Sequence, residues 1–164
     1  MTDVFIGLGS NTGPREQMLH RAAELLQERI GETVRLSAFY ETAPWGFDSP
    51  HAFLNAAILL RTPLSPGELL TATRRIEREL GRTRKSTDGG YADRCIDIDI
   101  LLYGDLVEET DVEAPDGVFH LSLPHPLMHR RLFVMEPLAE IAPHVLHPVL
   151  HKTFANLRDA LQTT

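Results

Sequence analysis

The chain has 164 residues, of which 43% are hydrophobic and 24% are charged, and its formal net charge at pH 7 is −7. This length and balance are typical of one globular domain and argue against a disordered or membrane-embedded chain. The acidic charge argues against a general nucleic-acid binder. The single cysteine, Cys95, excludes an intrachain disulfide and favours a reducing, cytoplasmic environment.

No segment predicts membrane insertion or export. The longest strongly apolar run, residues 52–60, is far shorter than the roughly 20 residues that cross a bilayer. Residues 1–5 lack the basic and apolar regions of a signal peptide. We therefore expect a cytoplasmic protein with a single domain spanning residues 1–164.

The first half of the chain predicts two strands, a helix and a third strand. Residues 4–9 predict a buried strand, and a turn at residues 10–13 leads into a helix over residues 14–30. The glycines at 7, 9 and 13 do not have the dinucleotide-binding spacing G-x-G-x-x-G, so close backbone packing is the favoured explanation. Residues 33–40 predict the second strand and residues 53–61 the third.

Between these strands, residues 41–49 predict an irregular loop whose aromatic residues either cover a ligand or cap the core. Asn55 interrupts the apolar pattern of the third strand. A buried amide needs hydrogen-bond partners, and either neighbouring backbone or a flat heterocycle with ring nitrogens can supply them. The sequence leaves both alternatives open.

The second half begins with a helix whose start is marked by a capping box at Ser65 and Glu68 and which extends to about Leu80. A polar, glycine-containing loop over residues 86–93 precedes a strand at 95–103. Residues 108–117 predict an exposed acidic excursion, residues 118–123 a strand, and residues from His129 a helix that Pro137 interrupts. Residues 153–161 predict a short closing helix.

The strand at 95–103 carries the strongest chemical signal. Isoleucine recurs at 96, 98 and 100, which predicts one buried face, so Asp97 and Asp99 share the opposite face. Aspartate is disfavoured in strands, and two neighbouring carboxylates repel each other unless a cation lies between them. Two divalent ions in a phosphoryl-transfer site would fit this spacing. The alternative is a sheet whose polar face meets water.

Cations are concentrated just before this strand, where seven of the sixteen basic residues lie: Arg74, Arg75, Arg78, Arg82, Arg84, Lys85 and Arg94. Basic residues beside two carboxylates in an acidic protein indicate a polyanion bound together with a metal. His125 is held between two prolines, and its stiff backbone suits phosphate hydrogen bonding or metal ligation. The chain has one cysteine, so it cannot form the Cys₂His₂, Cys₃His or Cys₄ set of a structural zinc site, and we exclude such a site.

Several short motifs occur in a fixed order along the chain: Gly9-Ser10-Asn11, Pro44-x-Gly46, Phe53-Leu54-Asn55, Gly81-Arg82-x-Arg84, Arg94-x-Ile96-Asp97-Ile98-Asp99 and Leu123-Pro124-His125-Pro126. Each is weak alone. Together they closely resemble the hydroxymethylpterin pyrophosphokinases of folate biosynthesis, over about residues 3–160.

The resemblance implies an α+β fold, namely a single-domain ferredoxin-like sandwich in which helices flank an antiparallel sheet. It implies transfer of pyrophosphate from ATP, the co-substrate, to the hydroxymethyl group of a reduced pterin, with release of AMP. It also implies two Mg²⁺ ions held by Asp97 and Asp99, because oxygen ligands suit this metal. We expect a monomer that binds ATP and the pterin, without nucleic acid or membrane.

The resemblance also assigns residues to each part of the site. Catalytic roles fall on Arg82, Arg94, Asp97 and Asp99. ATP-binding roles fall on Glu77, Arg84, Lys85, Arg94, Ile100, His125 and Arg131. Pterin-binding roles fall on Thr42, Pro44, Gly46, Phe53, Asn55, Asp97 and Phe133.

The chain departs from the family pattern at three positions. Tyr91 lies in the loop where many relatives have a tryptophan, Arg74 replaces a glutamine found in some, and Pro126 replaces a tyrosine. These differences concern nucleotide affinity and loop kinetics. Two other functions use the same residues: a nucleotidyltransferase, which would release pyrophosphate instead of AMP, and a non-catalytic ligand-binding module.

Overall fold

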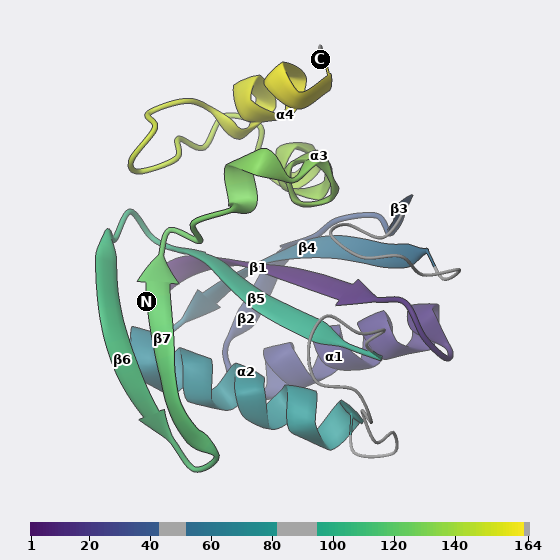
Figure 1. The fold of residues 1–164 in the computed structure, drawn as a ribbon, viewed down its shortest axis with the longest axis vertical. Helices are drawn as coiled ribbons and strands as arrows, with labels where there is room; N and C mark the ends of the chain where they lie inside the picture. The colour runs from purple at the N-terminus through teal and green to yellow at the C-terminus, as the bar shows by residue number, and fades with distance from the viewer. Residues whose placement is uncertain (43–51, 82–94, 163–164) are drawn as a thin grey trace.

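The computed structural model describes residues 1–42, 52–81 and 95–162. Its strands are β1 (Thr2–Ser10), β2 (Glu32–Leu36), β3 (Tyr40–Thr42), β4 (Phe53–Thr62), β5 (Asp97–Tyr103), β6 (Glu108–Ala114) and β7 (Gly117–Leu123). Its helices are α1 (Arg15–Arg29), α2 (Pro66–Gly81), the 3₁₀ turn η1 (Met128–Arg130), α3 (Leu132–Ile141) and α4 (Phe154–Gln162). Figure 1 shows their arrangement.

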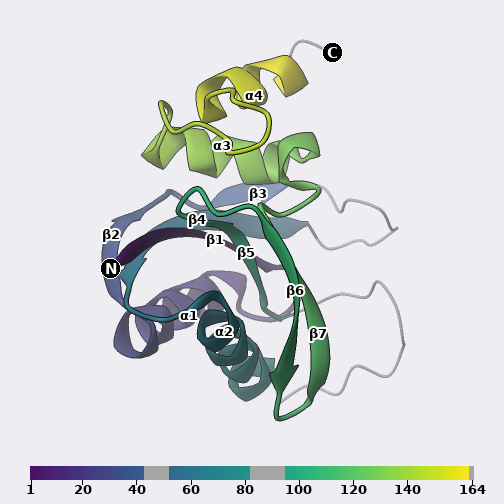
Figure 2. The ribbon, with the colours of Figure 1, turned by 90° about the vertical axis from the view of Figure 1, so that its left-hand side faces the viewer.

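The main sheet has the strand order β2-β4-β1-β5, with β3 beside β4, and every pairing in it is antiparallel. Helices α1 and α2 cover one face of the sheet, while α3 and α4 cover the other (Figure 2). Two β-α-β units with this order form a ferredoxin-like sandwich, so the fold predicted from the sequence is confirmed.

Each face of the sheet has its own apolar core. Ile96, Ile98 and Ile100 pack in the core beneath α1 and α2. Leu101 packs in the second core, beneath α3 and α4. The period of two therefore places the isoleucines on the face covered by α1 and α2, which is buried as predicted, and it places Asp97 and Asp99 on the opposite face, with Leu101.

The predicted second strand, residues 33–40, is wrong at its end, because β2 stops at Leu36 and β3 begins at Tyr40. The Ser37 amide still donates to the Ala57 carbonyl, but the Ser37 hydroxyl accepts from the Ala57 amide in place of a backbone carbonyl. The next amide, that of Ala38, donates to the Glu140 carboxylate of α3. The Ser37 and Glu140 side chains thus accept hydrogen bonds from amides that would otherwise bond to the carbonyls of a neighbouring strand, and β2 ends here.

The acidic stretch at residues 108–117 was expected to be an excursion, and this is wrong. Residues Glu108–Ala114 form β6, which pairs with β7 over seven residues in a two-stranded hairpin. This hairpin lies beside α2 (Figure 1). At its tip the Asp116 carboxylate accepts from the Arg78 guanidinium at 2.8 Å, and Arg74 lies 3.5 Å away.

Two helix boundaries test the expectations from local sequence. Ser65 and Glu68 exchange the two hydrogen bonds of a capping box, at 2.9 and 3.2 Å, as predicted. Pro137 does not interrupt α3, which continues to Ile141. Pro137 is buried within α3, although a proline in a helix interior lacks the amide for a helical hydrogen bond. Among the described residues, no helix is long and apolar enough to cross a membrane.

Candidate functional site

The register of three neighbouring strands brings the predicted site residues into two rows. Because β1 lies between β4 and β5, each β1 residue from Val4 to Gly9 has one partner on either side. One row consists of Asn55, Gly9 and Asp97, and the next consists of Ala57, Gly7 and Asp99. An amide and two carboxylates thus face one another across a central strand that has no side chains at these positions.

The two glycines of β1 keep the space between these groups open. A Cβ atom on Gly9 would lie 3.0 Å from the Asn55 Oδ1 atom and 3.6 Å from the Phe53 ring. A Cβ atom on Gly7 would lie 3.4 Å from the Leu101 side chain. The atoms nearest to both Cβ positions belong to side chains, so the favoured explanation, close backbone packing, is wrong for these two glycines. Gly13 has a positive φ of 68° in the turn before α1.

The resulting pocket has the sheet as its floor and α3 as one wall. Its lining includes Asn55, Asp97, Asp99 and Phe133, together with the glycines of β1. Four residues predicted from distant parts of the chain therefore meet in one pocket.

Asn55 is 5% exposed and donates from Nδ2 to the Thr42 Oγ1 atom at 2.7 Å. The bond joins β4 to β3, where Thr42 is paired with Phe53. It fixes the orientation of the amide and leaves its oxygen on the side of Gly9. The partner is a side chain and not the neighbouring backbone, so the buried amide retains hydrogen-bonding capacity toward the pocket.

Glu77 of α2 lies against the edge of β5. Its Oε2 atom accepts from the Ile98 amide at 2.9 Å, between the two aspartates. The pKa of Glu77 is raised to about 8, mainly by burial and also by the charges of Asp97 and Asp99, while the hydrogen bond from the Ile98 amide and the charge of Arg74 oppose the rise. Asp97 and Asp99 thus make a third negative charge at this place unfavourable. A cation bound nearby would reduce this repulsion.

His125 lies beside the same strand, since its amide donates to the Leu101 carbonyl at 2.9 Å. Its Nδ1 atom accepts from the Leu127 amide at 3.1 Å, so a neutral ring carries its proton on Nε2. The pKa of His125 is lowered to about 4, mainly by burial and also by the charge of Arg131, while Asp97 opposes the shift. The imidazole is therefore a neutral hydrogen-bond donor at pH 7.

The remaining predicted residues fall into two groups. Arg131 precedes α3, and its guanidinium lies 5.6 Å from the centre of the Phe133 ring, whereas the Ile100 side chain is buried in the core beneath α1 and α2. The predictions for Pro44, Gly46, Arg82, Arg84, Lys85, Tyr91 and Arg94 lie outside the described residues.

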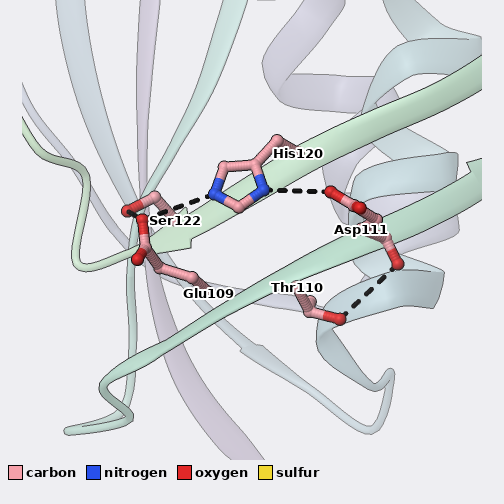
Figure 3. Close-up of polar contacts among 5 residues, drawn as sticks. All are labelled: Glu109, Thr110, Asp111, His120 and Ser122. Carbon is pink, nitrogen blue, oxygen red and sulfur yellow. Dashed lines mark hydrogen bonds and ion pairs between the residues drawn. The ribbon is translucent and has the colours of Figure 1, made fainter.

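A second polar cluster, on the hairpin, was missed because residues 108–117 were not expected to form a strand. The His120 ring lies between the carboxylates of Asp111, 3.0 Å from Nδ1, and Glu109, 3.3 Å from Nε2 (Figure 3). These two hydrogen bonds raise the pKa of His120. Arg74 was counted among the cations expected to bind a polyanion, and in the structure its guanidinium stacks on Phe119 of the hairpin at 3.5 Å.

The donors in the pocket suit one class of metal. Within the described ranges, no group of three or more His, Cys, Asp or Glu side chains could hold an ion by itself. Mg²⁺ is commonly bound by one or two carboxylates together with substrate phosphates, and not by an all-protein cage. Asp97 and Asp99 therefore fit Mg²⁺ that is completed by a phosphorylated ligand.

Comparison with known proteins gives a consistent result. The profile of the 7,8-dihydro-6-hydroxymethylpterin-pyrophosphokinase family matches residues 5–143. A 2-amino-4-hydroxy-6-hydroxymethyldihydropteridine pyrophosphokinase of Porphyromonas gingivalis is 52% identical over 148 residues, which cover 90% of this chain and 95% of that protein. The Bacillus subtilis enzyme of the same name is 44% identical over 142 residues, covering 86% and 78%.

Solved structures share the fold at lower sequence identity. A crystal structure of Plasmodium falciparum HPPK-DHPS wild type with STZ-DHP superposes with a TM-score of 0.78 at 17% identity, covering 99% of this chain and 42% of that chain. Another HPPK-DHPS structure, in complex with substrates, gives a TM-score of 0.76 at 14% identity and covers 97% and 43%. The chain spans less than half the length of these solved chains.

Proposed function

Because the chain belongs to the 7,8-dihydro-6-hydroxymethylpterin-pyrophosphokinase family, we propose that the pocket between the sheet and α3 is its active site. The enzyme transfers pyrophosphate from ATP to the hydroxymethyl group of 6-hydroxymethyl-7,8-dihydropterin and releases AMP, in folate biosynthesis. The observation that carries the site assignment is that Asn55 and both aspartates line one pocket.

The pterin occupies the end of the pocket near Asn55. The Asn55 amide forms hydrogen bonds with the polar edge of the pterin ring. The Thr42 hydroxyl accepts a hydrogen bond from this amide and so fixes its orientation. Phe53 and Phe133 stack on the two faces of the ring. Gly9 is required because a side chain there would occupy the space next to the Asn55 oxygen. Pro44 and Gly46 complete this end.

The triphosphate lies over the carboxylates of Asp97 and Asp99, which hold two Mg²⁺ ions. When bound, Mg²⁺ neutralises the charge of the phosphates and of the leaving group. His125 donates its Nε2 proton to a phosphate oxygen, which its fixed tautomer favours. Arg131 supplies positive charge on the same side, and it already lowers the pKa of His125.

The remaining assigned residues surround the nucleotide. Glu77 lies beside it, bonded to the β5 backbone between the two aspartates. The side chain of Ile100 is in the core, so its contribution to nucleotide binding comes from its main chain. We retain Arg82, Arg84, Lys85 and Arg94 as phosphate-binding residues, with Arg82 and Arg94 in catalytic roles.

The reaction is an in-line displacement at the β-phosphorus. The pterin hydroxyl oxygen attacks this atom, the bond from the β-phosphorus to the α–β bridging oxygen breaks, and AMP leaves with that oxygen. The hydroxyl loses its proton, and Asp97, which shares a row with Asn55, is our candidate acceptor. Positioning and charge neutralisation supply most of the catalysis in such transfers.

Product analysis tests the proposal. The protein is incubated with ATP, Mg²⁺ and the reduced hydroxymethylpterin, and the products are followed by phosphorus NMR and mass spectrometry. We expect AMP and a pterin diphosphate in equal amounts. Release of inorganic pyrophosphate with an adenylylated acceptor would indicate a nucleotidyltransferase, and no Mg²⁺-dependent consumption of ATP would indicate a binding module.

We also propose that the enzyme acts as a cytoplasmic monomer without nucleic acid. The acidic net charge and the lone cysteine support this. Light scattering during size-exclusion chromatography measures the mass directly, and the expected value is that of one chain, 18.4 kDa.

A further inference from the structure

Arg15, the first residue of α1, joins three segments beside the pterin end of the pocket. Its Nη1 atom donates to the Ala52 carbonyl at 2.8 Å, in a partly buried bond. Its Nη2 atom donates to the Glu41 carboxylate at 3.3 Å. One guanidinium therefore connects α1 with the chain entering β4 and with β3.

The topology of the sheet accounts for this arrangement. Strand β1 runs antiparallel to β4, so its last residue, Ser10, pairs with Leu54 near the start of β4. The turn that follows β1 contains Gly13 in a left-handed conformation and leads directly into α1. The first side chain of the helix is consequently placed next to the entrance of β4.

The two partners of Arg15 are the immediate sequence neighbours of two residues that we assign to the pterin site. Glu41 precedes Thr42, Ala52 precedes Phe53, and Thr42 and Phe53 are paired across β3 and β4. Thr42 in turn accepts the hydrogen bond that orients the Asn55 amide. The spacing between β3 and the start of β4 therefore affects how Thr42, Phe53 and Asn55 lie relative to one another.

We propose that Arg15 is a positioning residue for the pterin, and this inference rests on the proposed function. The guanidinium holds the end of β3 and the entrance of β4 at the separation that aligns Thr42 and Phe53 with Asn55. An exposed ion pair with Glu41 alone would contribute little. The bond to Ala52 differs, because its acceptor is a partly buried main-chain carbonyl and its donor is charged.

The test compares Arg15→Ala with Arg29→Ala, a matched change at the other end of the same helix. Arg29 forms an exposed ion pair with Glu79 on α2. Loss of one charge-assisted bond predicts about a tenfold rise in the pterin KM of Arg15→Ala, with the ATP KM and kcat within about twofold of wild type. Arg29→Ala should leave both KM values unchanged.

Two conservative variants keep the inference testable if Arg15→Ala folds poorly. Arg15→Lys retains one donor for the Ala52 carbonyl and should give an intermediate pterin KM. Glu41→Gln retains an acceptor for Arg15 and should change the pterin KM by less than about twofold, because this contact is exposed. These values separate the bond to Ala52 from the bond to Glu41.

An unchanged pterin KM in Arg15→Ala, or equal rises in the KM for both substrates, would overturn the positioning role. The calorimetric Kd of the pterin, measured with Mg²⁺ and α,β-methylene ATP, provides a second readout that does not depend on turnover. A wild-type protein that releases no AMP would refute the proposed function. The pterin Kd of wild type and Arg15→Ala would still decide the role of Arg15.

Discussion

Replacing Glu77 with glutamine should make the free energy of unfolding less dependent on pH. Glu77 is largely buried and accepts a hydrogen bond from the Ile98 amide, and its pKa is raised from 4.5 to about 8. Glutamine keeps an acceptor oxygen for this amide but cannot ionise. The substitution therefore removes the cost of the charge while it retains the contact.

The sign follows from the raised pKa. The folded protein binds the Glu77 proton more tightly than the unfolded chain, so the contribution of this group to stability is complete below pH 4.5. It is lost progressively as the pH rises toward about 8. At about 1.4 kcal/mol per pKa unit the full shift corresponds to roughly 5 kcal/mol, and relaxation of the site should reduce the observed effect to about 2–4 kcal/mol.

Urea denaturation in the presence of EDTA, at pH 5, 6.5 and 8, measures this effect. The advantage of Glu77→Gln over wild type should grow by about 2–4 kcal/mol between pH 5 and pH 8. Glu28→Gln is the matched control, because it removes an exposed carboxylate from α1. Parallel stability profiles for wild type and Glu77→Gln would refute the reasoning.

Three further predictions concern the pocket and the hairpin. Asp97→Asn and Asp99→Asn should each lower kcat for AMP release by at least about 100-fold with little change in the circular dichroism spectrum, because each removes a charged metal ligand; near-normal rates would contradict the metal assignment. Gly9→Ala should raise the pterin KM and leave the ATP KM unchanged, since its Cβ would lie 3.0 Å from the Asn55 oxygen; an unaltered pterin KM would show that the pterin does not approach Gly9. His120→Ala should lower the urea midpoint at pH 5.5 but not at pH 8.5, because the raised pKa means that the stabilising charge is lost as the pH rises; equal losses at both values would exclude an ionic contribution.

Local pattern was sufficient to predict the strand that carries the aspartates. Isoleucines at alternate positions define a buried face without any knowledge of the neighbouring strands, and the structure buries all three of them. The hairpin strand β6 had no such signal. Of its seven residues only Val112 is buried, so β6 lacks the alternation of apolar and polar residues that predicts a strand. Its acidic sequence therefore resembles that of an exposed loop.

The pocket itself could be predicted only in part. The resemblance to a family supplied Asn55, Phe133 and the aspartates as a set, but it did not explain why they meet. That explanation requires the register between β4, β1 and β5, which no local spacing encodes. The hydrogen bonds of Arg15 likewise link residues that are 26 and 37 positions apart, beyond the reach of any sequence motif.

The account depends most directly on Asp97 and Asp99 as the residues that bind the divalent ions. Mn²⁺, which takes the same oxygen ligands as Mg²⁺ and broadens NMR signals near it, tests this when it is titrated into ¹⁵N-labelled protein with ATP present. The amides of Gly7, Gly9 and Ile98 should broaden first, and Asp97→Asn should abolish the effect. Preferential broadening around Glu109 and Asp111 of the hairpin, with the β1 glycines unaffected, would contradict it.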